Sequence, residues 1–208
     1  MPLVRKPTHP PSQPKPTANA TLSGLRSANS EERWAAARSA VDIAGAATAL
    51  AEALRIEADP RVRETMFTSL ARIGGPEVAN QLLAMLRSDD AALRTGALDA
   101  LRSSVTASRE LLPQLLRDPD VDVRILSCEL ARGLPTEEAT RHLCALLDVE
   151  PEVNVCAAAV EVLAEVGNPD ALPALTQCAH RFSRAPFLGF AIQVAADRIN
   201  AETARRRG

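Results

Sequence analysis

Cysteine and histidine are the side chains in this sequence best suited to metal binding or nucleophilic catalysis. The chain has four cysteines and three histidines, at Cys128, Cys144, Cys156, Cys178, His9, His142 and His180. Local zinc sites use C-x-x-C or H-x-x-H pairs, and the sequence contains neither pair. Cys128 falls on an apolar helical stripe, and Cys144 and Cys178 lie in apolar helical segments, so we expect buried structural thiols. Phosphate-loop, nucleophile-elbow and dinucleotide-binding glycine motifs do not occur either. The sequence therefore predicts a protein without catalytic residues, metal or cofactor.

Arginine recurs at a regular interval and is the second candidate for chemistry. The anchor positions, separated by 30, 31, 30 and 32 residues, are Arg33, Arg63, Arg94, Arg124 and Cys156. Acidic residues lie six positions before three of these anchors, at Glu57, Asp118 and Glu150. Arginine binds both carboxylates and phosphates through two parallel hydrogen bonds. The regular spacing favours a structural ladder over a phosphate site, with Glu57 serving Arg63 and either Asp118 or Glu150 serving Arg124.

A third set of residues lies on the expected outer surface of the same segments. Five residues after each anchor stand Arg38, Thr68, Asp99, Glu129 and Glu161. Stacked in register, the three carboxylates would form an acidic stripe, although solvated surface acids are the alternative. Trp34 and Ile125 follow their anchors directly and are expected on or beside this surface. Exposed tryptophan among apolar and charged groups is typical of a protein-binding patch, whereas Trp34 could instead cover the open end of the first helix.

The elements that must position these residues are helices. Small and large apolar residues follow each anchor at +3, +4 and +7, which is the one-sided stripe of an amphipathic helix. Glycine and proline, as in Gly74-Gly75-Pro76, end each such helix and open a second one with its own leucine stripe. A turn then leads to the next anchor. The repeating unit is a pair of antiparallel helices of about 30 residues, and no strand is needed.

This pattern resembles the HEAT-like repeats first recognised in bacterial phycobilin lyases. The resemblance rests on "DPRVR", "DPDVDVR", "LARIG" and "LAEVG" and covers residues 25–204. It implies an all-α fold, an α-solenoid of about eleven helices, whose anchored helices face the concave side. Gly189 replaces the anchor arginine in the last pair, as expected of a capping repeat. The resemblance also implies an alternative role as a bilin lyase-like or cofactor-protein assembly factor. The His-Glu pairs of iron-dependent HEAT-repeat hydroxylases do not occur.

Charge and composition divide the chain into three parts. Of its 208 residues, 1–24 are proline-rich and basic and are expected to be a disordered tail, 25–204 form the solenoid, and 205–208 form a basic C-terminal tail. Residues 31–204 hold 17 arginines and 26 acidic residues, which argues against nucleic-acid binding. No apolar run could span a membrane and no secretory signal is evident, so a cytoplasmic location is expected.

These features together predict a non-catalytic adaptor or scaffold. It would bind another protein, one with a basic patch, on its concave acidic face, in a bacterial signalling or assembly complex. Neither nucleic acid nor a membrane is an expected partner.

Overall fold

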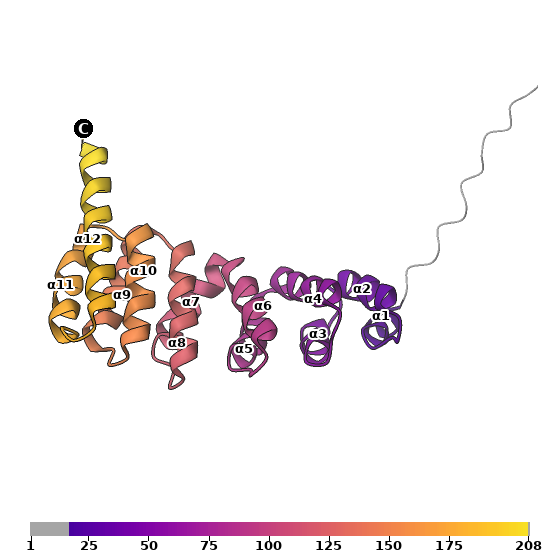
Figure 1. Cartoon of the computed structure of the whole chain (residues 1–208). Coiled ribbons are helices and arrows are strands. Elements are labelled where there is room, and N and C mark those ends of the chain that lie inside the picture. The colour runs from indigo at the N-terminus through magenta and orange to yellow at the C-terminus, as the bar shows by residue number, and fades with distance from the viewer. Residues whose placement is uncertain (1–16, 208) are drawn as a thin grey trace, which may run out of the picture.

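The computed structural model describes residues 17–207, of which 206 and 207 are described by their backbone only. This part of the chain contains helices and no strand (Figure 1). The α-helices are α1 (Ala18–Gly24), α2 (Ser30–Ser39), α3 (Ala46–Leu54), α4 (Pro60–Ile73), α5 (Gly75–Leu86), α6 (Ala91–Arg102), α7 (Val105–Leu115), α8 (Val121–Cys128), α9 (Thr136–Val149), α10 (Val153–Val166), α11 (Leu172–Arg181) and α12 (Pro186–Arg207). Two short 3-10 helices complete the list, η1 (Glu129–Gly133) and η2 (Pro169–Ala171).

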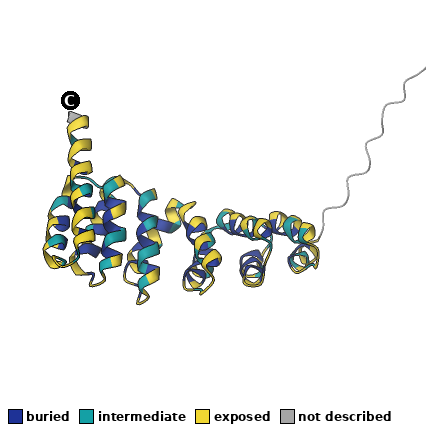
Figure 2. Ribbon diagram, in the orientation of Figure 1, coloured by how far each residue is buried: buried dark blue, intermediate teal, exposed yellow. Residues whose placement is uncertain are grey.

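From α2 onward the helices form two layers of a solenoid. One layer contains α2, α4, α6, α8 with η1, α10 and α12, each in contact with the next along the stack. The other layer contains α3, α5, α7, α9 and α11. The dark-blue buried faces in Figure 2 lie where helices pack together, and the yellow exposed faces lie outside. The predicted fold class, an all-α solenoid of antiparallel helix pairs, is confirmed.

Local sequence signals explain where the anchored helices begin. Their N-cap residues accept hydrogen bonds from backbone N–H groups of the first turn, which would otherwise lack partners. These N-caps are Asn29, Asp59, Asp90 and Asp120. Pro60, directly after one cap, suits the first helical position because that position needs no N–H. Gly74 and Gly75 have φ of 63° and 80°, a conformation that favours glycine. Gly74 separates α4 from α5, and Gly75 is the first residue of α5.

Leucine and alanine supply most of the core. Leu50, Leu70, Leu101 and Leu143 are fully buried between the layers, and alanines such as Ala37 allow close helix approach. The core continues through every repeat, which is how a solenoid stabilises units that cannot fold alone.

Two of the predicted boundaries are wrong. The tail predicted for 1–24 ends earlier, because α1 begins at Ala18, is capped by Thr17 and contacts α2. Thr21 and Leu25, four residues apart, bury their side chains there, which offsets the entropy of ordering the segment. The remainder of that predicted tail, residues 1–16, lies outside the described residues. The C-terminal tail predicted for 205–208 is helical to Arg207 as part of α12.

The stack twists between its two ends. In the view of Figure 1, α2 and α4 run across the page, whereas α8, α10 and α12 run up it. The change of direction falls between α6 and α8, where α8 is short and continues directly into η1. Within residues 17–207, no helix is long and apolar enough to cross a membrane.

Candidate protein-binding surface

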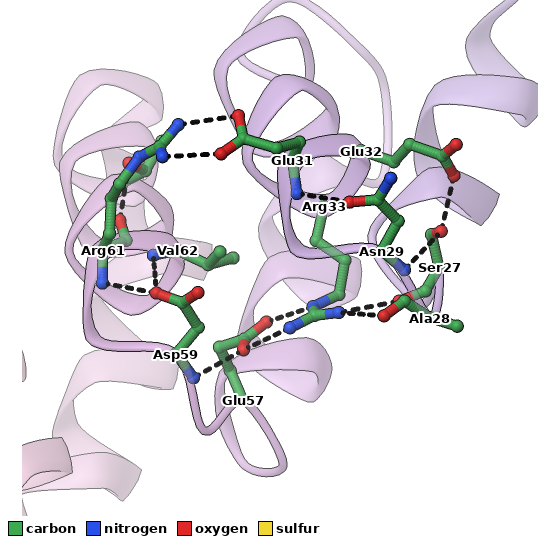
Figure 3. A network of polar contacts seen from close by, with 11 residues as sticks. Ser27, Ala28, Asn29, Glu31, Glu32, Arg33, Glu57, Asp59, Arg61 and Val62 are labelled. Carbon is green, nitrogen blue, oxygen red and sulfur yellow. Dashed lines mark hydrogen bonds and ion pairs between the residues drawn. The ribbon is translucent and has the colours of Figure 1, made fainter.

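The turn before each anchored helix is a repeated hydrogen-bonded unit. Around the first anchor, Arg33 donates Nε and Nη2 to the two carboxylate oxygens of Glu57 at 2.7 and 2.9 Å (Figure 3). Its Nη1 donates to the carbonyl oxygens of Ser27 and Ala28. Glu57 also accepts a hydrogen bond from the backbone N–H of Asp59, so one buried carboxylate joins two repeats. The bond from Arg33 holds the pKa of Glu57 below its ordinary value.

The same unit recurs around the fourth anchor. Arg124 donates Nε and Nη2 to Glu150, both at 2.9 Å, and Nη1 to the carbonyl oxygen of Asp118 at 2.8 Å. Glu150 accepts from the backbone N–H of Glu152. Only 12 % of the Arg124 side chain and 3 % of the Glu150 side chain are exposed. This geometry is that of a structural ladder, because Arg124 and Glu150 bind each other inside the stack and are almost fully buried.

Of the pairings predicted from spacing, the one for Glu57 is out of register by one repeat, whereas Glu150 is the correct one of the two alternatives for Arg124. Glu57 binds Arg33, the anchor of the preceding repeat, and does not bind Arg63. Glu57 and Glu150 lie in the turns just before α4 and α10, and they bind the arginines of the preceding anchored helices, α2 and α8. Asp118 departs further, since its carboxylate accepts from Arg87 and from the backbone N–H of Asp120. Arg94 forms no ion pair with any described residue, and its Nη1 donates to the carbonyl oxygen of Ser88 at 2.7 Å.

Arg63 is the anchor that keeps a buried donor without a partner among the described residues. The position that supplies a glutamate to Arg33 and to Arg124 is Ser88 in the next repeat, whose hydroxyl is too short to reach it. Arg63 instead donates Nη2 to Asp90 at 3.0 Å, and its buried Nε has no hydrogen-bond partner among the described residues. An unpaired buried donor costs about 1–3 kcal/mol.

Replacing Ser88 with glutamate is expected to stabilise the protein. The new carboxylate would reach Arg63 as Glu57 reaches Arg33, and it could still accept from the N–H of Asp90 as the Ser88 hydroxyl does. We expect the free energy of unfolding to rise by about 1 kcal/mol, measured by urea denaturation. Ser88→Gln has the same length without the charge and should gain clearly less. Equal gains in both variants would contradict an ion pair with Arg63.

The thiols are set in packed surroundings. Cys128, Cys156 and Cys178 are buried, and burial raises the pKa of Cys128 to about 12 and that of the half-buried Cys144 to about 11. Thiols with such pKa values are protonated at neutral pH and are poor nucleophiles. A hydrogen bond with the Cys178 thiol, together with burial, raises the pKa of Cys156. Burial lowers the pKa of His142. Among residues 17–207, no three histidine, cysteine or acidic side chains gather to hold a metal ion.

The layer formed by α2, α4, α6, α8, α10 and α12, which we call the anchored-helix layer, carries three of the grooves found in the described part of the chain. The first groove, of about 710 Å³, runs between α4 and α6 and is lined largely by apolar surface. Phe67, Ala71, Ala92 and Ala100 line it together with Gly96. The absence of a side chain at Gly96 is required here, because a Cβ at this position would lie 2.1 Å from a ring carbon of Phe67. Predicted residues Thr68 and Asp99 are exposed at this groove.

The second groove lies between α2 and α4 and contains Trp34. The half-buried Trp34 ring has the guanidinium carbons of Arg38 and Arg61 at 4.6 and 4.7 Å from its centroid, within cation–π range. Arg61 also donates to both carboxylate oxygens of Glu31, at 2.7 and 2.9 Å (Figure 3). Arg72 completes the rim of this groove. The structure therefore brings predicted residues Trp34, Arg38 and Thr68 together and adds Arg61 and Arg72.

The third groove, of about 770 Å³, lies against α10 and α12 near the other end of the stack. Predicted residues Ile125 and Glu161 line it, with Phe190 and Val194 of α12. Phe190 is 73 % exposed, which is unusual for a large apolar side chain on a helix whose other face packs into the core. Its contribution could not be anticipated, because the last repeat lacks the anchor pattern.

The predicted acidic stripe is interrupted by an arginine. Arg132 donates to both carboxylate oxygens of Glu129, at 2.8 and 3.2 Å. It also forms ion pairs with Glu161, at 3.7 Å, and with Glu165. Glu129, followed by Glu165, raises the pKa of Arg132. Glu129 is half-buried and bound to Arg132, while Glu161 and Asp99 are exposed. Arg132 lies eight residues after its anchor, a position that the prediction of the stripe did not include. Arg102 stands at the same position after Arg94 and forms the corresponding ion pair with Asp99, at 4.0 Å.

The chain matches a known protein family over most of its length. A family model described as HEAT repeats matches residues 18–102 and 108–185, which is more than half of the chain. The chain therefore belongs to the HEAT-repeat family, as the resemblance predicts. Among curated proteins, no sequence matches it.

Solved structures show similarity at low sequence identity. An engineered protein is 20 % identical, with a TM-score of 0.42 over 88 % of this chain and 98 % of that chain. A designed armadillo repeat protein in complex with the peptide (KR)4 is 19 % identical, with a TM-score of 0.42 over 86 % and 98 %. The complex of CpcE and CpcF of phycocyanin lyase from Nostoc sp. is 17 % identical, with a TM-score of 0.39 over 95 % and 100 %.

Proposed function

We propose that this HEAT-repeat solenoid is a non-catalytic scaffold that binds a partner protein along its anchored-helix layer. The observation that carries the proposal is the row of grooves on that layer, at α2/α4, at α4/α6 and at α10/α12. Each groove combines apolar lining with charged rims, which is the composition of a protein interface. Solenoids present extended surfaces of this kind without needing an enclosed active site.

The acidic contribution to binding comes from the C-terminal half of the layer. Glu129, Glu161 and Glu165 surround Arg132, so three carboxylates share one guanidinium beside the third groove. The excess negative charge suits a basic segment of the partner, and charge complementarity of this kind raises the association rate and the specificity. The cytoplasm of a bacterium is the compartment in which we place this interaction.

A pull-down tests the function itself. The full chain, tagged and incubated with a lysate of its own organism, should retain a specific protein that purifies with it as a stoichiometric complex. A variant with the α4/α6 groove filled, Thr95→Leu, serves as the comparison, because Thr95 is exposed and lines that groove. Failure of any protein to form such a complex would contradict the scaffold role.

Removing the exposed acids is expected to weaken the binding of a basic ligand. Asp99→Asn combined with Glu161→Gln should reduce affinity for the partner, or for the probe peptide (KR)4, about fivefold, since each exposed ion pair contributes about 0.2–1 kcal/mol. The salt dependence of binding, measured by isothermal titration calorimetry, should decrease as well. Glu110→Gln, which changes an exposed acid on α7 of the other layer, is the matched control. Unchanged affinity and salt dependence would show that these acids are only solvated surface.

A further inference from the structure

The end of the anchored-helix layer formed by α2 and α4 differs in charge from the acidic end. Arg38, Arg61 and Arg72 line the second groove, with Glu64 as the acid on the same rim. Arg61 is matched by Glu31 through two hydrogen bonds. Arg38 and Arg72 are exposed, and within residues 17–207 neither forms an ion pair. Two guanidinium groups against one carboxylate leave this rim with an excess of positive charge, although the solenoid as a whole is acidic.

Trp34 orders two of the arginines on this rim, Arg38 and Arg61, by contact with their guanidinium groups. The guanidinium carbons of Arg38 and Arg61 both lie over the Trp34 ring, at 4.6 and 4.7 Å from the ring centroid. Stacking on the ring limits the conformations of Arg38, and the two hydrogen bonds to Glu31 fix Arg61 (Figure 3). An arginine whose side chain is already ordered loses less entropy when it binds an anion.

The apolar groove begins where this rim ends. Glu64, Thr68 and Arg72 line both the second groove and the groove between α4 and α6. A ligand that places an anionic group at Arg72 therefore has the surface lined by Phe67 and Ala71 directly beside it. A ligand that fits both surfaces therefore has an anionic group for the arginines of the rim and an apolar group for the groove beside it.

We propose that this junction binds a peptide segment of the partner in which an acidic side chain adjoins a large apolar side chain. The carboxylate binds Arg38 and Arg72, and the apolar side chain enters the groove lined by Phe67. This proposal rests on the scaffold function and names the chemistry of the partner at one end of the layer. Together with the acidic groups around Arg132, it implies a partner with opposite charges at the two ends of its binding segment.

Trp34 provides a direct readout, because it is the one tryptophan in a chain that has no tyrosine. Its fluorescence in the full chain is titrated with short synthetic peptides that carry Glu-Leu repeats flanked by Gly-Ser. Matched peptides replace Glu with Gln, Glu with Lys, Leu with Ser, or Glu with phosphoserine. We expect the Glu-Leu peptide to change the fluorescence saturably. The Gln, Lys and Ser versions should bind about tenfold more weakly, which corresponds to about 1.4 kcal/mol.

Variants assign the effect to named residues. Arg38→Gln and Arg72→Gln should each weaken the Glu-Leu peptide about tenfold. Arg55→Gln, an exposed arginine at the end of α3 in the other layer, should leave its affinity unchanged. Thr95→Leu should weaken the Glu-Leu peptide and leave the weak Glu-Ser peptide unaffected, because it fills the groove and keeps the rim. Circular dichroism of each variant shows whether it is folded.

Several results would overturn this proposal. Equal fluorescence titrations with Lys-Leu and Glu-Leu peptides would exclude a cationic site, and saturation by the phosphoserine peptide alone would identify a phosphopeptide site instead. No response to any peptide would also reject it. Retention of the captured partner by an Arg38→Gln/Arg72→Gln double variant would refute this site and leave the scaffold function standing, whereas failure to capture any partner would refute the scaffold function.

Discussion

Replacing Arg124 with alanine is expected to lower the free energy of unfolding by about 3–5 kcal/mol. The substitution leaves Glu150 as a buried carboxylate with one backbone N–H as its remaining partner, and it also leaves the carbonyl oxygen of Asp118 without its donor. Breaking a buried pair from one side is this costly because the surviving charge has no compensation. Such a loss is a large part of the total stability of a domain, about 5–15 kcal/mol.

The anchors themselves supply graded controls for this experiment. Arg94→Ala should cost less than Arg124→Ala, since Arg94 donates one hydrogen bond and forms no ion pair among the described residues. Arg141→Ala, at an exposed position of α9, should melt like the parent. Urea denaturation of the three variants ranks their free energies of unfolding. Glu150→Ala, alone and combined with Arg124→Ala, completes a double-mutant cycle that measures the coupling energy between Arg124 and Glu150. If Arg124→Ala melts like the parent but loses a ligand, the anchors form a binding site and their structural role is wrong.

Replacing Gly96 with alanine is expected to destabilise the protein by about 1 kcal/mol. Alanine inside a helix is ordinarily better than glycine by about 1 kcal/mol. At this position the added Cβ would lie 2.1, 2.5 and 2.7 Å from three ring carbons of Phe67, so the ring has to leave its place. Overpacking of a well-packed contact costs about 1–3 kcal/mol, which outweighs the gain in helix propensity.

Gly189 is the matched control for this substitution. It also lies inside a helix, α12, but a Cβ there meets nothing within 4 Å. Gly189→Ala should therefore stabilise the protein by about 1 kcal/mol in the same thermal or urea assay. In a Phe67→Leu background the ring is replaced by a smaller side chain, so Gly96→Ala should lower the free energy of unfolding by less than it does in the parent. Stabilisation by Gly96→Ala comparable to that of Gly189→Ala would show that Phe67 does not pack against α6 as described.

The sequence by itself determines the repeat architecture of this protein. Asp59, Asp90 and Asp120 cap helices within their own turns, and Gly74 and Gly75 end a helix through their own backbone conformation. These effects act over a few residues, so they can be read from a short segment and are repeated with each unit. Apolar spacing then dictates that the helices stack in two layers, because each helix has one stripe to bury.

The tertiary structure decided which groups meet across repeats. Spacing identified Glu57 as a partner of an anchor, but only the packing of one turn against the preceding helix shows that the anchor is Arg33. Arg132 joins Glu129 to Glu161 of the next anchored helix, and this pairing replaces the predicted continuous stripe. The junction of Trp34, Arg38 and Arg72 likewise depends on the offset between two helices. Contacts of this kind are set by helix packing geometry and side-chain reach, neither of which is encoded in the period of a single repeat.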